Sequence, residues 1–110
     1  MKRIDKPWGY EEIWANTQDY VGKLLCIKSG NKLSKQYHRI KEETIYVIEG
    51  DLINYDAEDK PTIIKQGESF HVSPHQVHRF CADKADVKLI EVSTPYLDDV
   101  VRIEDDYGRS

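Results

Sequence analysis

The sequence predicts an all-β barrel, and three observations lead to this prediction. Short runs of β-branched and aromatic residues recur at even spacing, as they do in β-sandwiches and barrels. Turn-forming Gly, Pro, Asn and Asp residues separate the runs, and each of them favours tight turns. Gly, Pro and β-branched residues interrupt every window that could form an amphipathic helix. A chain of 110 residues supports one hydrophobic core, so we expect a single domain over residues 1–110.

Six of these runs are the predicted strands: residues 21–28, 44–48, 61–65, 69–72, 77–81 and 87–94. Successive side chains of a strand point to opposite faces. Glu43, Ile45 and Val47 therefore share one face, and a charged carboxylate lies on a face that is otherwise apolar. A buried polar group needs a partner, so this face is the first place to look for a site.

The chain after residue 96 has a different composition. Residues 97–106 are acidic, and we expect one helical turn there. We expect the whole tail, residues 97–110, to fold back over the mouth of the barrel. The alternative is a frayed, solvated tail.

Composition and charge exclude several classes of function. The net charge is −4 with no long basic run, so we expect no binding to nucleic acid or to a membrane surface. No apolar run approaches the ~20 residues that span a bilayer, and no secretory signal follows the basic start. Cys26 and Cys81 form no metal or redox motif, and we expect two core thiols in a cytoplasmic protein.

The four histidines fall in two short windows, one around His38 and one spanning residues 71–78. Gln36 and Glu43 flank His38, and His78 ends the second window. Imidazole nitrogens with carboxylate and amide oxygens form a mixed ligand set that suits Zn, Mn, Fe, Co or Ni. On composition alone, hydrogen-bonded core histidines explain the same residues.

The spacing of these residues resembles the two motifs of the cupin superfamily. The first motif is Gly, five residues, His-x-His, four residues, Glu, six residues, Gly, and the chain reproduces it from Gly30 to Gly50 with Gln36 as the first ligand. The second motif resembles the stretch from Gly67 to His78, with Ser73, His75 and Ala82 departing from its Pro, Gly and Asn. The resemblance implies a cupin double-stranded β-helix, or jelly-roll barrel, that holds one divalent metal ion through Gln36, His38, Glu43 and His78.

A narrower resemblance covers nearly the whole chain. Residues 6–10, 32–38, 77–80, 90–92 and 101–109 are similar to segments of type II mannose-6-phosphate isomerases, which also use Gln as the first ligand. This resemblance implies a metal-dependent aldose–ketose isomerase acting on a sugar phosphate, in the first place mannose 6-phosphate and fructose 6-phosphate. Residues 39–42 and 44–45 depart from the His- and Arg-containing family segment, which affects the substrate preference.

Such a reaction needs a residue that moves a proton and cations that hold the phosphate. The candidates for proton transfer are Lys32, His75 and Glu42. The alternatives are a solvated turn lysine, an exposed loop histidine and a solvated neighbour of Glu43. The candidates for phosphate binding are Arg79, Arg102 and Arg109, since the guanidinium fork matches phosphate oxygens; ordinary surface arginines are the alternative.

Two other functions remain open at this point. One is a cupin dioxygenase of a small molecule, which would keep open positions on Fe(II). The other is a non-catalytic module that binds a sugar, because fold alone does not determine function. Cupins of this size often pair, so we also expect a homodimer.

Overall fold

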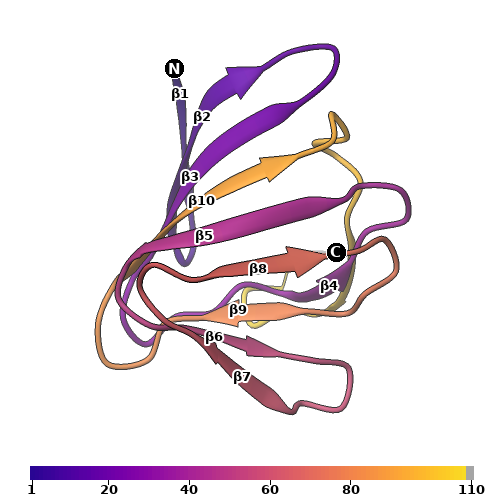
Figure 1. Cartoon of the computed structure of the whole chain (residues 1–110). Helices are drawn as coiled ribbons and strands as arrows, with labels where there is room; N and C mark the ends of the chain where they lie inside the picture. The colour runs from indigo at the N-terminus through magenta and orange to yellow at the C-terminus, as the bar shows by residue number, and fades with distance from the viewer. Residues whose placement is uncertain (109–110) are drawn as a thin grey trace.

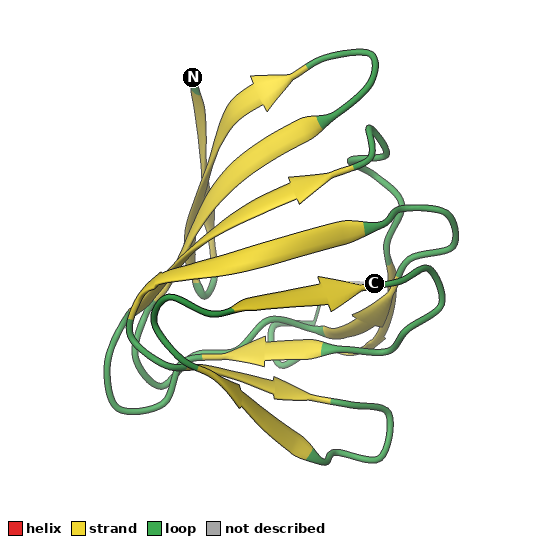
Figure 2. Cartoon of the chain, viewed as in Figure 1, coloured by secondary structure: helices red, strands yellow, loops and turns green. Residues whose placement is uncertain are grey.

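A computed structural model describes residues 1–108, which form strands joined by turns and loops (Figures 1 and 2). Within this range there are eleven strands and no helix. The strands are β1 (Lys2–Lys6), β2 (Gly9–Asn16), β3 (Val21–Ile27), β4 (Lys35–Tyr37), β5 (Glu43–Glu49), β6 (Leu52–Tyr55), β7 (Pro61–Ile64), β8 (Ser69–Val72), β9 (Arg79–Cys81), β10 (Val87–Ser93) and β11 (Val101–Glu104). The predicted all-β class is therefore confirmed.

The strands form three antiparallel sheets, counted over residues 1–108. The largest has six strands in the order β1-β2-β3-β10-β5-β8, the second has the order β7-β6-β9, and the third pairs β11 with β4. Isolated bridges between Lys32 and Cys81 and between Gln36 and His78 join the two smaller sheets. Figure 1 shows the large sheet on one side and the smaller sheets on the other, which together enclose the interior.

All six predicted strands are confirmed, with ends that shift by a residue or two. Residues 69–72 match β8, and residues 87–94 correspond to β10 (Val87–Ser93). The helical turn expected within 97–106 is wrong, because residues 97–98 form a turn and β11 follows it. The β-branched pair Val101 and Ile103 favours an extended backbone, and β11 pairs with β4 instead of coiling.

The hydrophobic core lies between the large sheet and the smaller ones. On β5, Ile45 and Val47 are fully buried, whereas Tyr46 is 49% exposed, as the predicted alternation requires. Leu89 from β10 and Phe80 from β9 join the same core cluster. Burying one such side chain contributes about 1.5–3 kcal/mol relative to leaving it exposed, so the core fixes the register of the strands that carry the polar site.

Residues 1–108 contain no helix with the length and apolar character to cross a membrane.

Candidate metal centre

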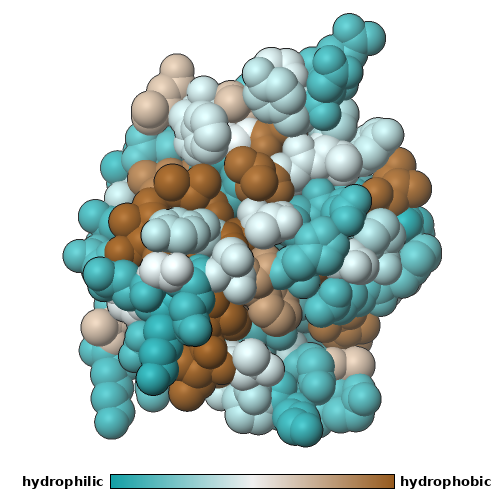
Figure 3. Space-filling model, viewed as in Figure 1, coloured by the Kyte–Doolittle hydropathy of each residue, from teal (hydrophilic) through white to brown (hydrophobic). Residues whose placement is uncertain are grey.

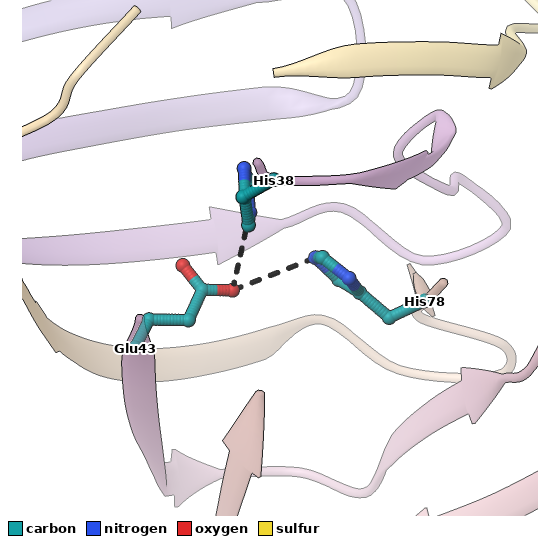
Figure 4. Close-up of side chains that lie close together, drawn as sticks. All are labelled: His38, Glu43 and His78. Atoms are coloured by element: carbon teal, nitrogen blue, oxygen red, sulfur yellow. Dashed lines mark ion pairs between the residues drawn. The ribbon is translucent and has the colours of Figure 1, made fainter. Parts of the chain in front are cut away.

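Three side chains from separate parts of the chain meet inside the barrel. His38 follows β4, Glu43 begins β5 and His78 immediately precedes β9. One ligand atom from each lies within 4.8 Å of the others. Figure 4 shows the Glu43 carboxylate pointing between the two imidazole rings. The sheets thus bring together side chains that are 40 residues apart in sequence.

The cluster is buried and closely spaced. One carboxylate oxygen, Glu43 Oε1, lies 3.5 Å from His78 Nε2 and 3.8 Å from His38 Nε2. The three residues are between 0 and 3% exposed. Charged and polar groups this deep are costly unless they find partners, so the cluster calls for a partner that all three residues share.

Hydrogen bonds to backbone carbonyls orient both histidines. His38 Nδ1 lies 2.5 Å from the carbonyl of Asp99, and His78 Nδ1 lies 3.1 Å from that of Gln76. A carbonyl oxygen only accepts, so each Nδ1 carries the proton and donates it. In the neutral ring, Nε2 then keeps its lone pair and points it at the cluster, as in the usual arrangement of a metal-bound histidine.

Gln36 lies at the edge of the same cluster. Its amide Nε2 is 3.5 Å from His78 Nε2, and its Oε1 accepts a hydrogen bond from Ser34 Oγ at 3.0 Å. The amide oxygen would be the metal ligand, and a half-turn of the nearly isosteric amide presents it to the cluster. Gln36 therefore lies next to the other three candidate ligands, with its amide nitrogen directed towards them.

The donor set fits a divalent cation. His38 Nε2 is fully buried and has no hydrogen-bond partner, although buried nitrogens normally have one. Two neutral imidazole nitrogens, a carboxylate and an amide form the N/O set that Zn, Mn, Fe, Co and Ni accept. Among the residues described, Gln36, His38, Glu43 and His78 would hold such an ion.

A buried lysine balances the carboxylates around the cluster. Lys41 Nζ lies 3.2 Å from Glu43 Oε2 and 3.1 Å from Glu91 Oε2. Burial alone would lower the pKa of Lys41, but the charges of Glu91 and Glu43 outweigh it and raise this pKa well above its ordinary value. Lys41 therefore stays charged.

The ligands themselves have shifted pKa values. Burial works against ionisation of Glu43, but the neighbouring His38 and the charge of Lys41 overcome it and hold the pKa of Glu43 well below its ordinary value. Burial lowers the pKa of His78, with the charge of Glu43 opposing the shift. An ionised carboxylate and a neutral imidazole are the forms that bind a metal.

Asp99 holds the ligand-bearing loop in place. Its carboxylate accepts hydrogen bonds from the backbone N–H groups of Arg39, Ile40 and Lys41 at 2.7–3.1 Å. Its own carbonyl orients His38. The loop between two ligands is thus fastened by one residue of the tail.

A cavity of about 120 Å³ lies beside the cluster, and its lining is strongly charged. Seven of the lining residues are charged and three are candidate metal ligands, with Glu43 belonging to both groups. Most of the others are apolar. The lining residues are Lys6, Trp8, Glu11, Lys23, Leu25, Leu33, Ser34, Gln36, His38, Lys41, Glu43, Phe80, Glu91, Leu97, Val100 and Arg102. Such a lining suits a small polar molecule.

The three residues predicted to transfer a proton are not among the lining residues. Lys32 pairs with Asp106 at 3.4 Å, and Glu42 pairs with the exposed His71 at 2.9 Å. His75 is exposed and has a φ of 68°, which is the left-handed conformation of the Gly that it replaces in the motif.

The three arginines predicted to bind phosphate have different positions. Arg102 lines the cavity from β11, directly opposite Gln36 of β4. Arg79 is buried away from that lining, where it donates to the Leu33 carbonyl and to Asp106, both at 2.8 Å. Arg109 lies outside the described residues. Arg102 is thus the candidate that the fold brings to the ligand cluster.

Sequence reasoning missed the charged residues of the inner faces. Lys23 shares its parity with Leu25 and Ile27, and Glu91 shares its parity with Leu89. A charged residue on an otherwise apolar strand face indicates a buried polar site. The same pattern that pointed to Glu43 is therefore present at Lys23 and Glu91. Asp99 had no such signal, because it lies in an irregular segment.

Comparison with known proteins agrees with this geometry. The family model described as "Mannose-6-phosphate isomerase C-terminal" matches residues 1–105. The mannose-1-phosphate guanylyltransferase ManC of Salmonella typhimurium is 35% identical over 116 residues, which cover 98% of this chain and 23% of ManC. The chain spans about a quarter of the length of the curated relatives it matches.

Two solved structures show the same fold. A cupin-like protein from Thermotoga maritima has a TM-score of 0.77 at 15% identity, and the match covers 87% of this chain and 76% of that one. A cupin described as a sugar phosphate isomerase from Silicibacter pomeroyi has a TM-score of 0.63 at 21% identity, covering 69% and 50%. The chain therefore has the cupin double-stranded β-helix fold.

Proposed function

This chain belongs to the mannose-6-phosphate isomerase C-terminal family, and from that premise we propose that it is a metal-dependent aldose–ketose isomerase. The proposed substrate is a sugar phosphate, with mannose 6-phosphate and fructose 6-phosphate as the first pair to test. The observation that supports this most is the buried cluster of His38, Glu43 and His78 beside a charged cavity. The Silicibacter pomeroyi cupin described as a sugar phosphate isomerase shares the fold.

Each part of the site has a role in this proposal. A divalent cation on Gln36, His38, Glu43 and His78 would supply a Lewis acid for the carbonyl and hydroxyl oxygens of the sugar. Arg102 offers a planar fork for the phosphate oxygens. The half-buried Lys6 and the buried Lys23 add positive charge to the same cavity. We also propose a cytoplasmic location, which the two free, buried thiols of Cys26 and Cys81 support.

A coupled assay tests the proposal directly. Fructose 6-phosphate formed from mannose 6-phosphate is converted to glucose 6-phosphate, and its oxidation is followed as NADPH. We expect turnover that a chelator abolishes and that one of Zn, Mn, Fe, Co or Ni restores. His38→Ala and His78→Ala should lower kcat by at least about 100-fold, together with the metal content. The matched control is His71→Ala, since His71 is exposed and lies outside the cluster. Turnover that survives complete metal removal contradicts the proposal.

One observation favours a second candidate. His38, Glu43 and His78 together are a two-His, one-carboxylate set, which is also the set of non-haem Fe(II) oxygenases. An ion held by these three residues alone would keep positions open for oxygen. Oxygen consumption by the Fe(II)-loaded protein with sugar substrates, in the absence of isomerase turnover, would favour this activity over the isomerase.

A further inference from the structure

A pair of opposite charges lies on the inner face of the large sheet. Glu91 of β10 is the register partner of Lys23 of β3, and the two residues are 5% and 7% exposed. Both line the cavity that contains the ligand cluster. Two charged residues deep inside a small barrel have a desolvation cost that apolar residues of similar size would avoid, so their presence calls for a reason.

Glu91 is one side chain away from the ligands. Its Oε2 lies 3.1 Å from Lys41 Nζ, and the same Nζ lies 3.2 Å from Glu43 Oε2. Glu91 Oε2 is fully buried, with Lys41 as its charged neighbour and no other hydrogen-bond donor. Lys41 thus holds Glu91 beside the ligand cluster.

The three buried carboxylates of the cavity differ in their partners. Glu11 contacts Lys23 at 3.5 Å and Lys6 at 3.8 Å. Glu43 belongs to the ligand cluster. Glu91 has Lys41 as its close partner, and burial together with the charge of Glu43 raises the pKa of Glu91 to about 7, against the opposing charges of Lys41 and Lys23. A group of this kind can accept and return a proton near neutral pH.

We propose that Glu91 is the catalytic carboxylate that carries the proton between C1 and C2 of the sugar phosphate. This inference rests on the proposed isomerase function. The Glu91 carboxylate removes the C2 proton of the open-chain aldose, and the C–H electron pair becomes the C1–C2 double bond as the negative charge moves to O1. The Glu91 carboxyl group, whose proton can exchange with solvent, then protonates C1, the O2 proton passes to O1, and the C2 carbonyl forms. No oxidant or reductant is needed.

Glu91→Gln tests the assignment, because it keeps the size of the side chain and removes its basicity. We expect kcat to fall by about 10²- to 10⁴-fold, with the bound metal and the circular dichroism spectrum unchanged. In D₂O, the wild type should exchange the C2 proton of mannose 6-phosphate with solvent, as followed by NMR, and the variant should not. Glu49→Gln is the matched control, since its side chain is 60% exposed on β5 and its activity should equal that of the wild type.

Glu91→Asp separates a chemical role from a structural one. It keeps a negative charge for Lys41 but withdraws the carboxylate from the cavity. A catalytic Glu91 predicts that kcat falls at least about tenfold while KM changes little. If Glu91 is only a counter-ion for Lys41, Asp should restore full activity, and that result overturns the assignment. Proton exchange at the wild-type rate in Glu91→Gln overturns it too.

If Glu91→Gln fails to fold, the Asp variant decides alone. A wild-type protein without sugar-phosphate turnover would disprove the isomerase proposal and this inference together, whereas an active wild type with an active Gln variant would disprove only this inference.

Discussion

At the scale of single residues, the backbone orients the site as much as the side chains do. The carbonyls of Asp99 and Gln76 fix the protonated nitrogen of His38 and His78. Carbonyls that hold a particular tautomer raise metal affinity, because no proton has to be displaced from Nε2. The motif spacing predicted which residues meet. It did not predict which nitrogen each ring presents, because the partners are backbone atoms of distant residues.

His75 has the left-handed backbone that its motif normally reserves for Gly. Because this conformation costs a residue with a Cβ about 1–2 kcal/mol, we expect His75→Gly to raise the free energy of unfolding by about 1 kcal/mol in a urea titration. His75→Ala is the control, since it removes the ring but keeps the Cβ, and it should not stabilise the protein. The prediction that His75 transfers a proton requires a loss of kcat in both variants. Unchanged kcat in both would rule out that role.

Asp99 is expected to matter for both stability and metal binding. Asp99→Ala removes three charge-assisted hydrogen bonds from the loop that carries the ligands. We expect a loss of about 1–2 kcal/mol in the free energy of unfolding and a metal affinity about tenfold weaker, measured by calorimetric titration. Asp98→Ala is the neighbouring exposed control and should change neither quantity by much. If Asp99→Ala binds the metal with wild-type affinity, the hydrogen bonds from Asp99 to the loop are not needed for metal binding.

Asp99 also makes the stability of the protein depend on pH in the acid range. The N–H group of Ile40, followed by those of Lys41 and Arg39, lowers the pKa of Asp99 from its ordinary value of 3.8 to about 2. Because the folded pKa is the lower one, the stabilisation is complete above about pH 4 and is lost as the pH falls towards 2. The difference in stability between wild type and Asp99→Asn should therefore be constant from pH 5 to 7 and shrink below pH 4.

At the scale of elements, the alternation of side chains explains what the sequence could and could not predict. The strand that carries Glu43, Ile45 and Val47 was predicted because its pattern alternates cleanly. β4 (Lys35–Tyr37) was missed because its residues, Lys, Gln and Tyr, include no β-branched residue. β1 and β2 were missed because charged residues interrupt them. β11 was mistaken for a helical turn because its pairing with β4, not its acidic composition, determines its conformation.

Two positions on β10 test this alternation. Leu89 points into the core and is fully buried, whereas Val92 points outward and is 48% exposed. Leu89→Ala should lower the free energy of unfolding by about 2–5 kcal/mol, and Val92→Ala should change it by less than about 0.5 kcal/mol. Equal losses in a urea titration would mean that the register of β10 differs from the one described.

At the scale of the whole molecule, the tail completes the site. Arg102 and Val100 line the cavity, and Asp99 fastens the ligand loop. Asp106 holds Lys32 and Arg79, and Tyr107 donates to Asn31 at 2.9 Å. The sequence suggested that the tail approaches the barrel mouth. The detailed partners could not be predicted, because they depend on ion pairs between residues more than 25 positions apart.

The homodimer also remains a proposal at this scale, and the outer face of the large sheet offers a test. Trp14, Tyr46 and Val92 are exposed there by 46–49%, and Trp14 lies over Gly22, the register partner of Val92. Figure 3 shows that hydrophobic patches are also exposed between hydrophilic residues on the face drawn there. A second copy would bury such a surface.

We expect a dimer by light scattering, and Tyr46→Lys should convert it to a monomer because a charge would be buried at the interface. Ile63→Lys is the control, since Ile63 is 57% exposed on β7 in another sheet, and this variant should remain dimeric. A monomeric wild type at micromolar concentration contradicts the proposal.

The place of β10 in the large sheet has a consequence for how the protein is made. β10 lies between β3 and β5, so its two neighbours leave the ribosome well before it does. Until residue 93 emerges, both present unpaired backbone edges, which readily pair with other chains. Pairing across such long separations is also slow. The nascent chain should therefore be most prone to aggregate just before β10 appears, and it would benefit there from a chaperone that covers open strand edges.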